Sequence, residues 1–194
     1  MRLTDDALAQ IAENRLLSAW GTNLTRHPHQ LNRPHAADAE LIPLPGTDLL
    51  LATTIDTIAE EIALGFSKSP ETIGWMGATV SLSDLAAVGA TPLGLVSSVM
   101  LPRDASHDFQ AGIARGLDAA CRAAGTFVLG GDTNSGDAAL ITTAGIGTVP
   151  RDRVMTRVGC KAGDIVYASG PLGMGGAVAA RALLDLPPEL FAEA

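Results

Sequence analysis

Apolar residues along this chain recur in two patterns, one with the period of a helix and one typical of buried strands. Near the N-terminus, Leu8, Ile11 and Leu16 form a stripe with helical spacing, which predicts a helix over residues 5–19 capped by Thr4. Residues 21–47 hold four prolines and few apolar anchors, so we expect a loop there. Apolar runs predict strands at residues 48–56, 93–100, 126–129, 138–149 and 164–169.

Capping residues mark the ends of two long helices. Ser69 can cap a helix, and Pro70 suits its first turn. The negative charge of Glu71 is favoured by the helix dipole at that end. They predict a helix that runs to about Val88 and ends at Gly89. A second helix is expected over residues 106–124 and a third over residues 175–184. This mixture of helices and strands predicts an α/β or α+β fold with one sheet.

Composition limits the classes of partner. The chain has 194 residues, 47% of them hydrophobic, which indicates a packed globular protein. Its net charge of −8 argues against nucleic acid, because a phosphate backbone requires a basic face. A nucleotide bound through a metal remains compatible with that charge. With no signal peptide and no apolar run long enough for a membrane span, we expect a cytoplasmic protein with Cys121 and Cys160 as core residues.

Three aspartates lie at the ends of apolar segments or inside them, beside small or hydroxylated residues. Asp56 closes the strand over residues 48–56, and Asp132 follows Gly130 and Gly131 at what reads as a turn. Each alone is compatible with a capping or turn aspartate. Asp84 lies in an apolar stretch of a helix, where a carboxylate needs a partner. Carboxylate oxygens are ligands that Mg²⁺ prefers, with water and substrate phosphates completing its coordination. The histidines at positions 27, 29 and 35 are expected to be solvent-exposed loop residues.

Five segments in this order resemble thiamine-monophosphate kinase and, more broadly, the superfamily of aminoimidazole ribonucleotide synthetase and selenophosphate synthetase. The resemblance covers roughly residues 36–185. Its segments are Ala37-Asp38-Ala39, Thr53-Thr54-Ile55-Asp56, Ser81-Leu82-Ser83-Asp84-Leu85-Ala86-Ala87-Val88-Gly89, Gly130-Gly131-Asp132-Thr133, and Met155-Thr156-Arg157-Val158-Gly159 with the residues that follow it to Gly173.

The resemblance implies a fold, a pair of cofactors and a reaction. The fold is the N-terminal ATP-binding domain of this superfamily, with one mixed sheet, helices packed on one side and dimerisation through the sheet. The cofactors are Mg²⁺ and ATP, and the reaction is γ-phosphoryl transfer to a small phosphorylated acceptor such as thiamine monophosphate. It implies metal ligands at Asp38, Thr54, Asp56, Asp84 and Asp132, and ATP contacts at Gly131, Asp132 and Arg157. No residue is assigned a covalent catalytic role, because positioning and charge neutralisation carry such a transfer.

Several positions depart from the family pattern. Ala37 replaces the first aspartate of a pair, Ala63 a polar substrate contact, Ser81 an asparagine and Ala114 a tyrosine beside ATP. Ile55 reads as an extra residue, which could turn the Asp56 carboxylate to the other face of its strand unless a bulge absorbs it. The alternatives are therefore a non-catalytic nucleotide-binding or dimerisation module, or a related enzyme with another substrate. We expect an N-terminal helix and loop (1–35), a metal- and ATP-binding domain (36–170), and a linker with the start of an absent C-terminal domain (171–194).

Overall fold

A mixed five-stranded sheet organises the molecule. The computed structural model describes residues 12–168, 170, 172–184, 186 and 187. The strands lie in the order β1-β2-β5-β3-β4; only the β3–β4 pair is parallel. Their bounds are β1 Glu40–Pro43, β2 Leu49–Thr57, β3 Thr91–Pro102, β4 Val128–Gly136 and β5 Leu140–Pro150.

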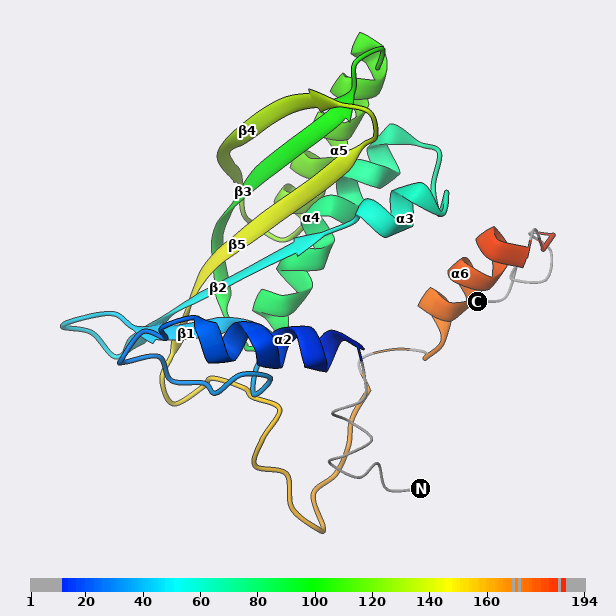
Figure 1. Cartoon of the computed structure of the whole chain (residues 1–194). Helices are drawn as coiled ribbons and strands as arrows, with labels where there is room; N and C mark the ends of the chain where they lie inside the picture. Colours follow the sequence, from blue (N-terminus) through cyan, green and yellow to red (C-terminus); the bar gives the residue numbers. More distant parts are fainter. Residues whose placement is uncertain (1–11, 169, 171, 185, 188–194) are drawn as a thin grey trace.

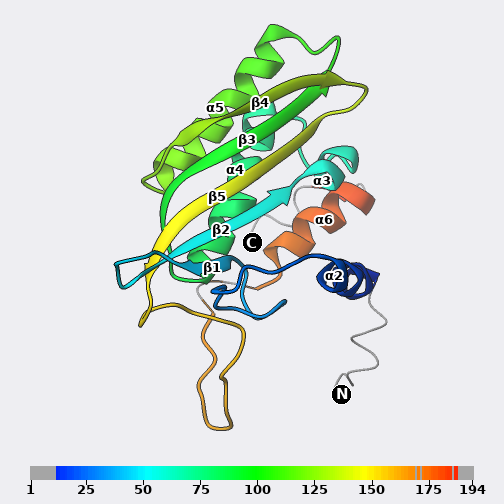
Figure 2. The same ribbon diagram turned by 60° about the vertical axis from the view of Figure 1, so that its left-hand side comes forward.

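Two long helices cover one face of this sheet and leave the other face open (Figures 1 and 2). They are α4 (Pro70–Ala87) and α5 (His107–Ala123), and the shorter helices are α2 (Ala12–Asn23), α3 (Ala59–Ala63) and α6 (Met174–Leu184). The core lies between α4, α5 and the sheet. Its largest fully buried side chains include Leu41, Leu50, Ile58, Leu85, Leu95, Ile113, Ile141 and Val149. In the part of the chain that the structure describes, no helix is both long and apolar enough to span a membrane.

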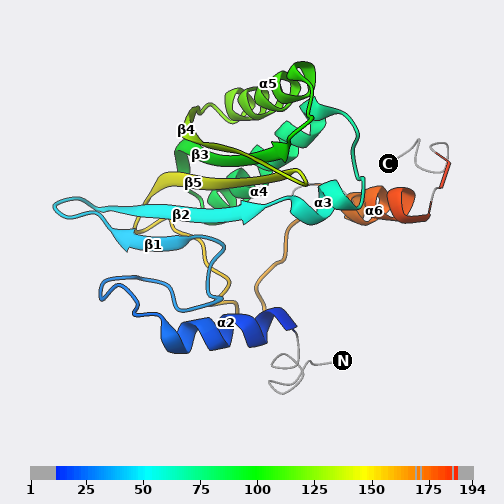
Figure 3. The same ribbon diagram turned by 45° about the horizontal axis from the view of Figure 1, so that its top comes forward.

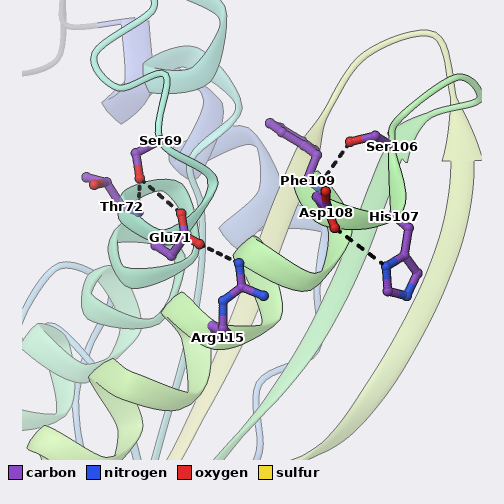
Figure 4. A network of polar contacts seen from close by, with 8 residues as sticks. All are labelled: Ser69, Glu71, Thr72, Ser106, His107, Asp108, Phe109 and Arg115. Atoms are coloured by element: carbon purple, nitrogen blue, oxygen red, sulfur yellow. Dashed lines mark hydrogen bonds and ion pairs between the residues drawn. The ribbon is translucent and has the colours of Figure 1, made fainter.

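The N-terminal ends of α4 and α5 are fixed by short polar contacts (Figure 4). Ser69 caps α4 by accepting a hydrogen bond from the Thr72 backbone N–H (3.3 Å), and Ser106 caps α5 in the same way. The Arg115 guanidinium on α5 lies 2.6 Å from a carboxylate oxygen of Glu71 on α4. These contacts begin both helices at the positions that the sequence predicts and tie the two together.

Glycines allow α4 and α5 to pack with their backbones close together. A methyl group at Gly116 of α5 would overlap the carbonyl oxygen of Glu71, and one at Gly74 of α4 would overlap that of Ile113. Side chains at these positions would therefore push the helices apart. The close approach fixes α4, which carries Asp84, against α5.

A buried polar cluster connects α4 to β5. The Ser81 hydroxyl donates to the Thr143 carbonyl oxygen (2.7 Å), and the Thr143 hydroxyl donates to the Gly77 carbonyl oxygen (2.7 Å). Ser81 and Thr143 are fully buried. Because the polar atoms of this cluster have partners inside the core, it fixes the position of α4 along the strand without leaving an unsatisfied group.

The structure confirms one sheet with helices on one side, and it corrects several predicted elements. The described part of the N-terminal helix ends at Asn23, past the expected end and through Gly21, while the predicted cap Thr4 and the predicted helical residues 5–11 lie outside the described range. The expected loop over residues 21–47 contains the edge strand β1, and α3 was not predicted. Residues 164–168 form no strand, and the last residue of that prediction is not described.

Two further predictions were wrong. The Gly-Gly-Asp segment at 130–132 lies inside β4 and is no turn, because β4 continues to Gly136 beside β3. Cys121 is buried as expected, but Cys160 is exposed. The three histidines are exposed, as predicted. The division into regions 1–35, 36–170 and 171–194 stays a prediction.

Candidate functional site

The centre of the candidate site is a hydrogen bond between β2 and α4. The Thr54 hydroxyl donates to the Asp84 carboxylate (Oγ1 to Oδ2, 2.7 Å), and both residues are partly buried. This contact supplies the partner that a carboxylate in an apolar helix requires. It also places a carboxylate of α4 against the end of β2 that leads into α3.

Asp56 lies on the same face of β2 as Thr54. The pairing of β2 with β5 runs without a bulge from Leu49 to Thr57, and it sets Thr54 opposite Gly145 and Asp56 opposite the buried Thr143. Residues two apart on a strand share a face. Ile55 therefore separates Thr54 from Asp56 by one full period, and the carboxylate stays on the helix side without the bulge that the sequence suggested. Asp56 is exposed and accepts a hydrogen bond from the Thr57 backbone N–H (2.7 Å).

Asp38 reaches the site from the segment that precedes β1. It forms an ion pair with Arg157, whose Nε lies 3.3 Å from Asp38 Oδ2. The backbone N–H of Arg157 donates to the Ala36 carbonyl oxygen (2.8 Å). Two segments more than a hundred residues apart in sequence are thus joined beside Asp84.

The charges around Asp84 act on its protonation. Burial raises the pKa of the Asp84 carboxyl, and the hydrogen bond from Thr54 lowers it. The negative charges of Asp56 and Asp38 raise this pKa further, while the Arg157 guanidinium lowers it. The net pKa shift is upward, because the ionised form is partly desolvated and faces two other carboxylates. A cation at this position would relieve that repulsion.

Gly131 and Asp132 lie elsewhere on the sheet. Asp132 of β4 pairs with Ser98 of β3, which pairs with Thr142 of β5. The β5 residues that face the helices have odd numbers, since Ile141 and Thr143 are buried. By strand alternation Asp132 therefore lies on the open face, opposite to Asp56. Its carboxylate accepts a hydrogen bond from the Asn134 side chain (2.6 Å).

The structure thus brings together four of the predicted ligands and leaves one apart. Asp38, Thr54, Asp56 and Asp84 gather at one end of the sheet with Arg157. β2 and β4 are separated by two intervening strands, or roughly 14 Å at the usual strand spacing. A single ion cannot bind both Asp132 and the four gathered residues, since metal–oxygen distances are only about 2.0–2.6 Å.

The donor set fits a hard cation that keeps part of its water shell. Among the described residues, no three His, Cys, Asp or Glu side chains are arranged so that they could enclose an ion by themselves. Mg²⁺ commonly binds through one or two carboxylates plus water and phosphate oxygens, and it does not require a complete protein cage. The Asp84 carboxylate, with Asp56 and Asp38 near it, suits that mode of binding.

A cavity of about 730 Å³ lies between α5 and the β3–β4 edge. Ala114 and Leu117 of α5 form one wall, and Val99, Thr133 and Asn134 of the two strands form the other. The cavity is large enough for a small-molecule ligand. Ala114, one of the departures from the family pattern, faces it and leaves that wall without a large side chain.

Sequence reasoning missed the residues that position the site. The sequence marks Ser81 only as a replacement for asparagine, yet with Thr143 this residue anchors α4 next to Asp84. A hydroxyl inside an apolar helical segment was the available signal for Ser81. Nothing local marked Thr143, because its role depends on the packing of α4 over β5.

Comparisons with known proteins agree with this fold. Residues 36–149 match the family model described as AIR synthase related protein, N-terminal domain. The thiamine-monophosphate kinase of Synechococcus elongatus is 32% identical over 138 residues, which are 71% of this chain and 42% of that protein. The crystal structure of tt0281 from Thermus thermophilus superposes with a TM-score of 0.81 at 26% identity, covering 94% of this chain and 58% of that one.

A further structure shares the fold at lower identity. AaThiL complexed with AMPPCP and TMP gives a TM-score of 0.64 at 21% identity over 77% of this chain and 45% of that chain. The chain spans about half the length of these relatives. The family match covers more than half of the chain and includes Asp38, Thr54, Asp56, Asp84 and Asp132. This chain therefore belongs to the AIR synthase related family and carries its N-terminal domain.

Proposed function

We propose that this domain binds ATP through Mg²⁺ and forms part of an enzyme that transfers the γ-phosphoryl group to a small phosphorylated acceptor. The observation that carries the proposal is the contact of Thr54 with Asp84, which holds a partly buried carboxylate beside two others. Thiamine monophosphate is the acceptor suggested by the relative in Synechococcus elongatus, named thiamine-monophosphate kinase. The complex of AaThiL with AMPPCP and TMP supports the pairing of an ATP analogue with such an acceptor.

The proposed ligands would act at two positions, one at the end of β2 and one on β4. Asp84, Asp56, Asp38 and the Thr54 hydroxyl would hold Mg²⁺ at the end of β2. Gly131 and Asp132 would contact the nucleotide from β4, where a glycine lets the backbone approach a phosphate closely. When bound, Mg²⁺ neutralises charge on the phosphate oxygens. Arg157 holds Asp38 in position and would contribute a guanidinium toward the same phosphates.

Titration calorimetry with AMPPCP, with and without Mg²⁺, tests this proposal. We expect binding that requires the metal and weakens about tenfold or more in Asp84→Asn and in Asp132→Asn. Asp48→Asn is the matched control: this exposed residue precedes the opposite end of β2, eight positions from Asp56, or roughly 26 Å along the strand. Equal nucleotide binding with and without metal would overturn the proposal, as would unchanged binding in both variants.

We also propose that the chain forms a homodimer through the open face of the sheet. Ile55, with 70% of its surface exposed, lies in one row with Ala144 and Val96 on that face. An exposed apolar side chain on an uncovered sheet face suits burial against a second copy. Sedimentation should therefore show a dimer that Ile55→Glu converts to a monomer, whereas a parent chain that sediments as a monomer would contradict this part.

The same open face favours a second candidate function, a non-catalytic dimerisation module. The two candidates differ in turnover and not in assembly. Release of ADP from ATP, measured with this domain together with the part of its relatives that it does not cover, would support the enzyme. Dimerisation without Mg²⁺-dependent nucleotide binding would support the module.

A further inference from the structure

The chain that follows β5 is tied to the body of the domain by backbone hydrogen bonds that end at Arg157. Residues 151–168 lead from β5 toward α6, outside the sheet and its two covering helices (Figures 2 and 3). The Met155 backbone N–H donates to the Val88 carbonyl oxygen at the end of α4 (3.2 Å), and the Arg157 backbone N–H donates to the Ala36 carbonyl oxygen (2.8 Å). We call residues 158–168, which come next, the exit segment.

The exit segment makes its polar contacts close to itself. In the described part of the chain, its hydrogen bonds and ion pairs lie within the segment or reach Thr156. Lys161 pairs with Asp164 (3.4 Å), and the apolar side chains are exposed, with Val166 at 95%. Arg157 is therefore the last residue through which polar contacts set the direction of the exit segment.

The side chain of Arg157 makes an ion pair at the same point. Its Nε lies 3.3 Å from Asp38 Oδ2, and its Nη2 pairs with Asp38 Oδ1. The guanidinium thus engages both carboxylate oxygens, and the Asp38 side chain is only 27% exposed. Such a bidentate pair fixes the geometry of both partners. One residue therefore holds the exit segment by its backbone and covers a carboxylate of the aspartate site.

A divalent cation and Arg157 compete for Asp38. Mg²⁺ binds carboxylate oxygens directly, so a guanidinium on the same carboxylate would lie beside a double positive charge and be repelled by it. The Arg157 side chain is 55% exposed, and an ion pair this exposed contributes little to stability. Water can therefore replace Asp38 around the guanidinium at small cost, and the ion pair is weak enough for a cation to break.

We propose that the Arg157–Asp38 ion pair is a latch that opens when Asp38 binds a cation, and that its opening loosens the exit segment. The inference rests on the proposed function, in which Asp38 is a ligand of Mg²⁺. Without metal, Arg157 shields Asp38 and holds the exit segment. With the ion pair broken, only the backbone hydrogen bond to Ala36 remains, and the guanidinium becomes available to the nucleotide phosphates. Occupancy of the aspartate site is thereby coupled to the direction of the chain beyond Arg157.

A spin label on Cys160 reports on the latch. Cys160 is exposed in the exit segment, whereas Cys121, the other cysteine of the chain, is fully buried. A nitroxide at Cys160 follows nanosecond motion of this segment by electron paramagnetic resonance. Adding Mg²⁺ in the presence of AMPPCP should shorten the rotational correlation time saturably, with the midpoint that calorimetry gives for nucleotide binding. AMPPCP without Mg²⁺ should leave the correlation time unchanged.

Two variants should open the latch without a cation. In metal-free Arg157→Gln and Asp38→Asn the correlation time should already equal the short value of the metal-loaded parent, and Mg²⁺ should shorten it no further. Arg153→Gln is the matched control, because it removes the same charge from the same stretch of chain. The Arg153 side chain is exposed and forms no ion pair within the described residues. Arg153→Gln should keep the long metal-free correlation time and the full response to Mg²⁺.

The outcomes separate this inference from the proposed function. Metal-dependent AMPPCP binding with an unchanged correlation time would overturn the latch and leave the proposed function intact. A metal-free correlation time in Arg157→Gln equal to that in Arg153→Gln would do the same, as would a full response to AMPPCP alone. Absence of metal-dependent binding in calorimetry would refute the proposed function and the latch together.

Discussion

Replacing Thr54 with valine tests the central contact of the site, because it exchanges only the hydroxyl for a methyl group. Valine keeps the β-branched shape on β2 and removes the hydroxyl that donates to Asp84 at 2.7 Å. A hydrogen bond to a charged group contributes about 1.5–3 kcal/mol. Both residues are only partly buried, so we take the lower end and expect the free energy of unfolding to fall by about 1.5 kcal/mol at neutral pH.

The loss should depend on pH in a defined direction. The hydrogen bond favours the ionised carboxylate and lowers the pKa of Asp84. Its contribution to stability is therefore complete above that pKa and disappears as the pH falls through it. In Thr54→Val the pKa of Asp84 should rise further, and the difference in stability from the parent should shrink in acid.

Urea unfolding at neutral and acid pH measures this difference, and Thr53→Val is the control. Thr53 is the neighbouring residue on the opposite face of β2, opposite Ile146 of β5. A double-mutant cycle with Asp84→Asn should give a coupling energy of about 1 kcal/mol. Equal losses in Thr54→Val and Thr53→Val, or a coupling energy of zero, would refute the assigned contact.

Three further outcomes follow from the same geometry. Without metal at neutral pH, Asp84→Asn should be more stable than the parent, because the raised pKa of Asp84 means that its ionised form destabilises the folded parent. The urea midpoints of Asp84→Asn and the parent should therefore converge as the pH falls. Gly116→Ala should cost at least about 2 kcal/mol by forcing α5 away from α4, while Gly21→Ala, which meets no neighbouring atom, should be neutral or slightly stabilising in thermal unfolding. Ser81→Ala should cost about 1–2 kcal/mol, measured by urea unfolding, because it removes the buried hydrogen bond to the Thr143 carbonyl oxygen.

Local sequence chemistry was sufficient for the long helices and the central strands. Capping and glycine stops depend on neighbouring residues, and α4 begins after Ser69 as expected. The edge strand β1 was missed because it has four residues and ends at Pro43, inside a proline-rich segment. The Gly-Gly-Asp part of β4 has poor strand propensity and is held by its pairing with β3.

The candidate site was predictable in its residues and only partly in its arrangement. The need of Asp84 for a partner could be inferred from its apolar surroundings, but the choice of Thr54 depends on how α4 packs over β2. The ion pair of Asp38 with Arg157 spans 119 positions, and no local pattern specifies such a contact. The face of β2 on which Asp56 lies follows from the alternation of side chains along a strand, because β2 pairs with β5 without a bulge.

Asp132 lies on the open face, one row from the row that contains Ile55 and Val96, which is the surface proposed for the second copy. A nucleotide that contacts Asp132 would therefore lie at or beside the dimer interface. Linkage requires that if nucleotide binding strengthens the dimer by some factor, dimerisation strengthens nucleotide binding by the same factor. Under the two proposals the open face carries both the second copy and the nucleotide contact at Asp132, whereas Asp56 and Asp84 lie on the helix side of the sheet.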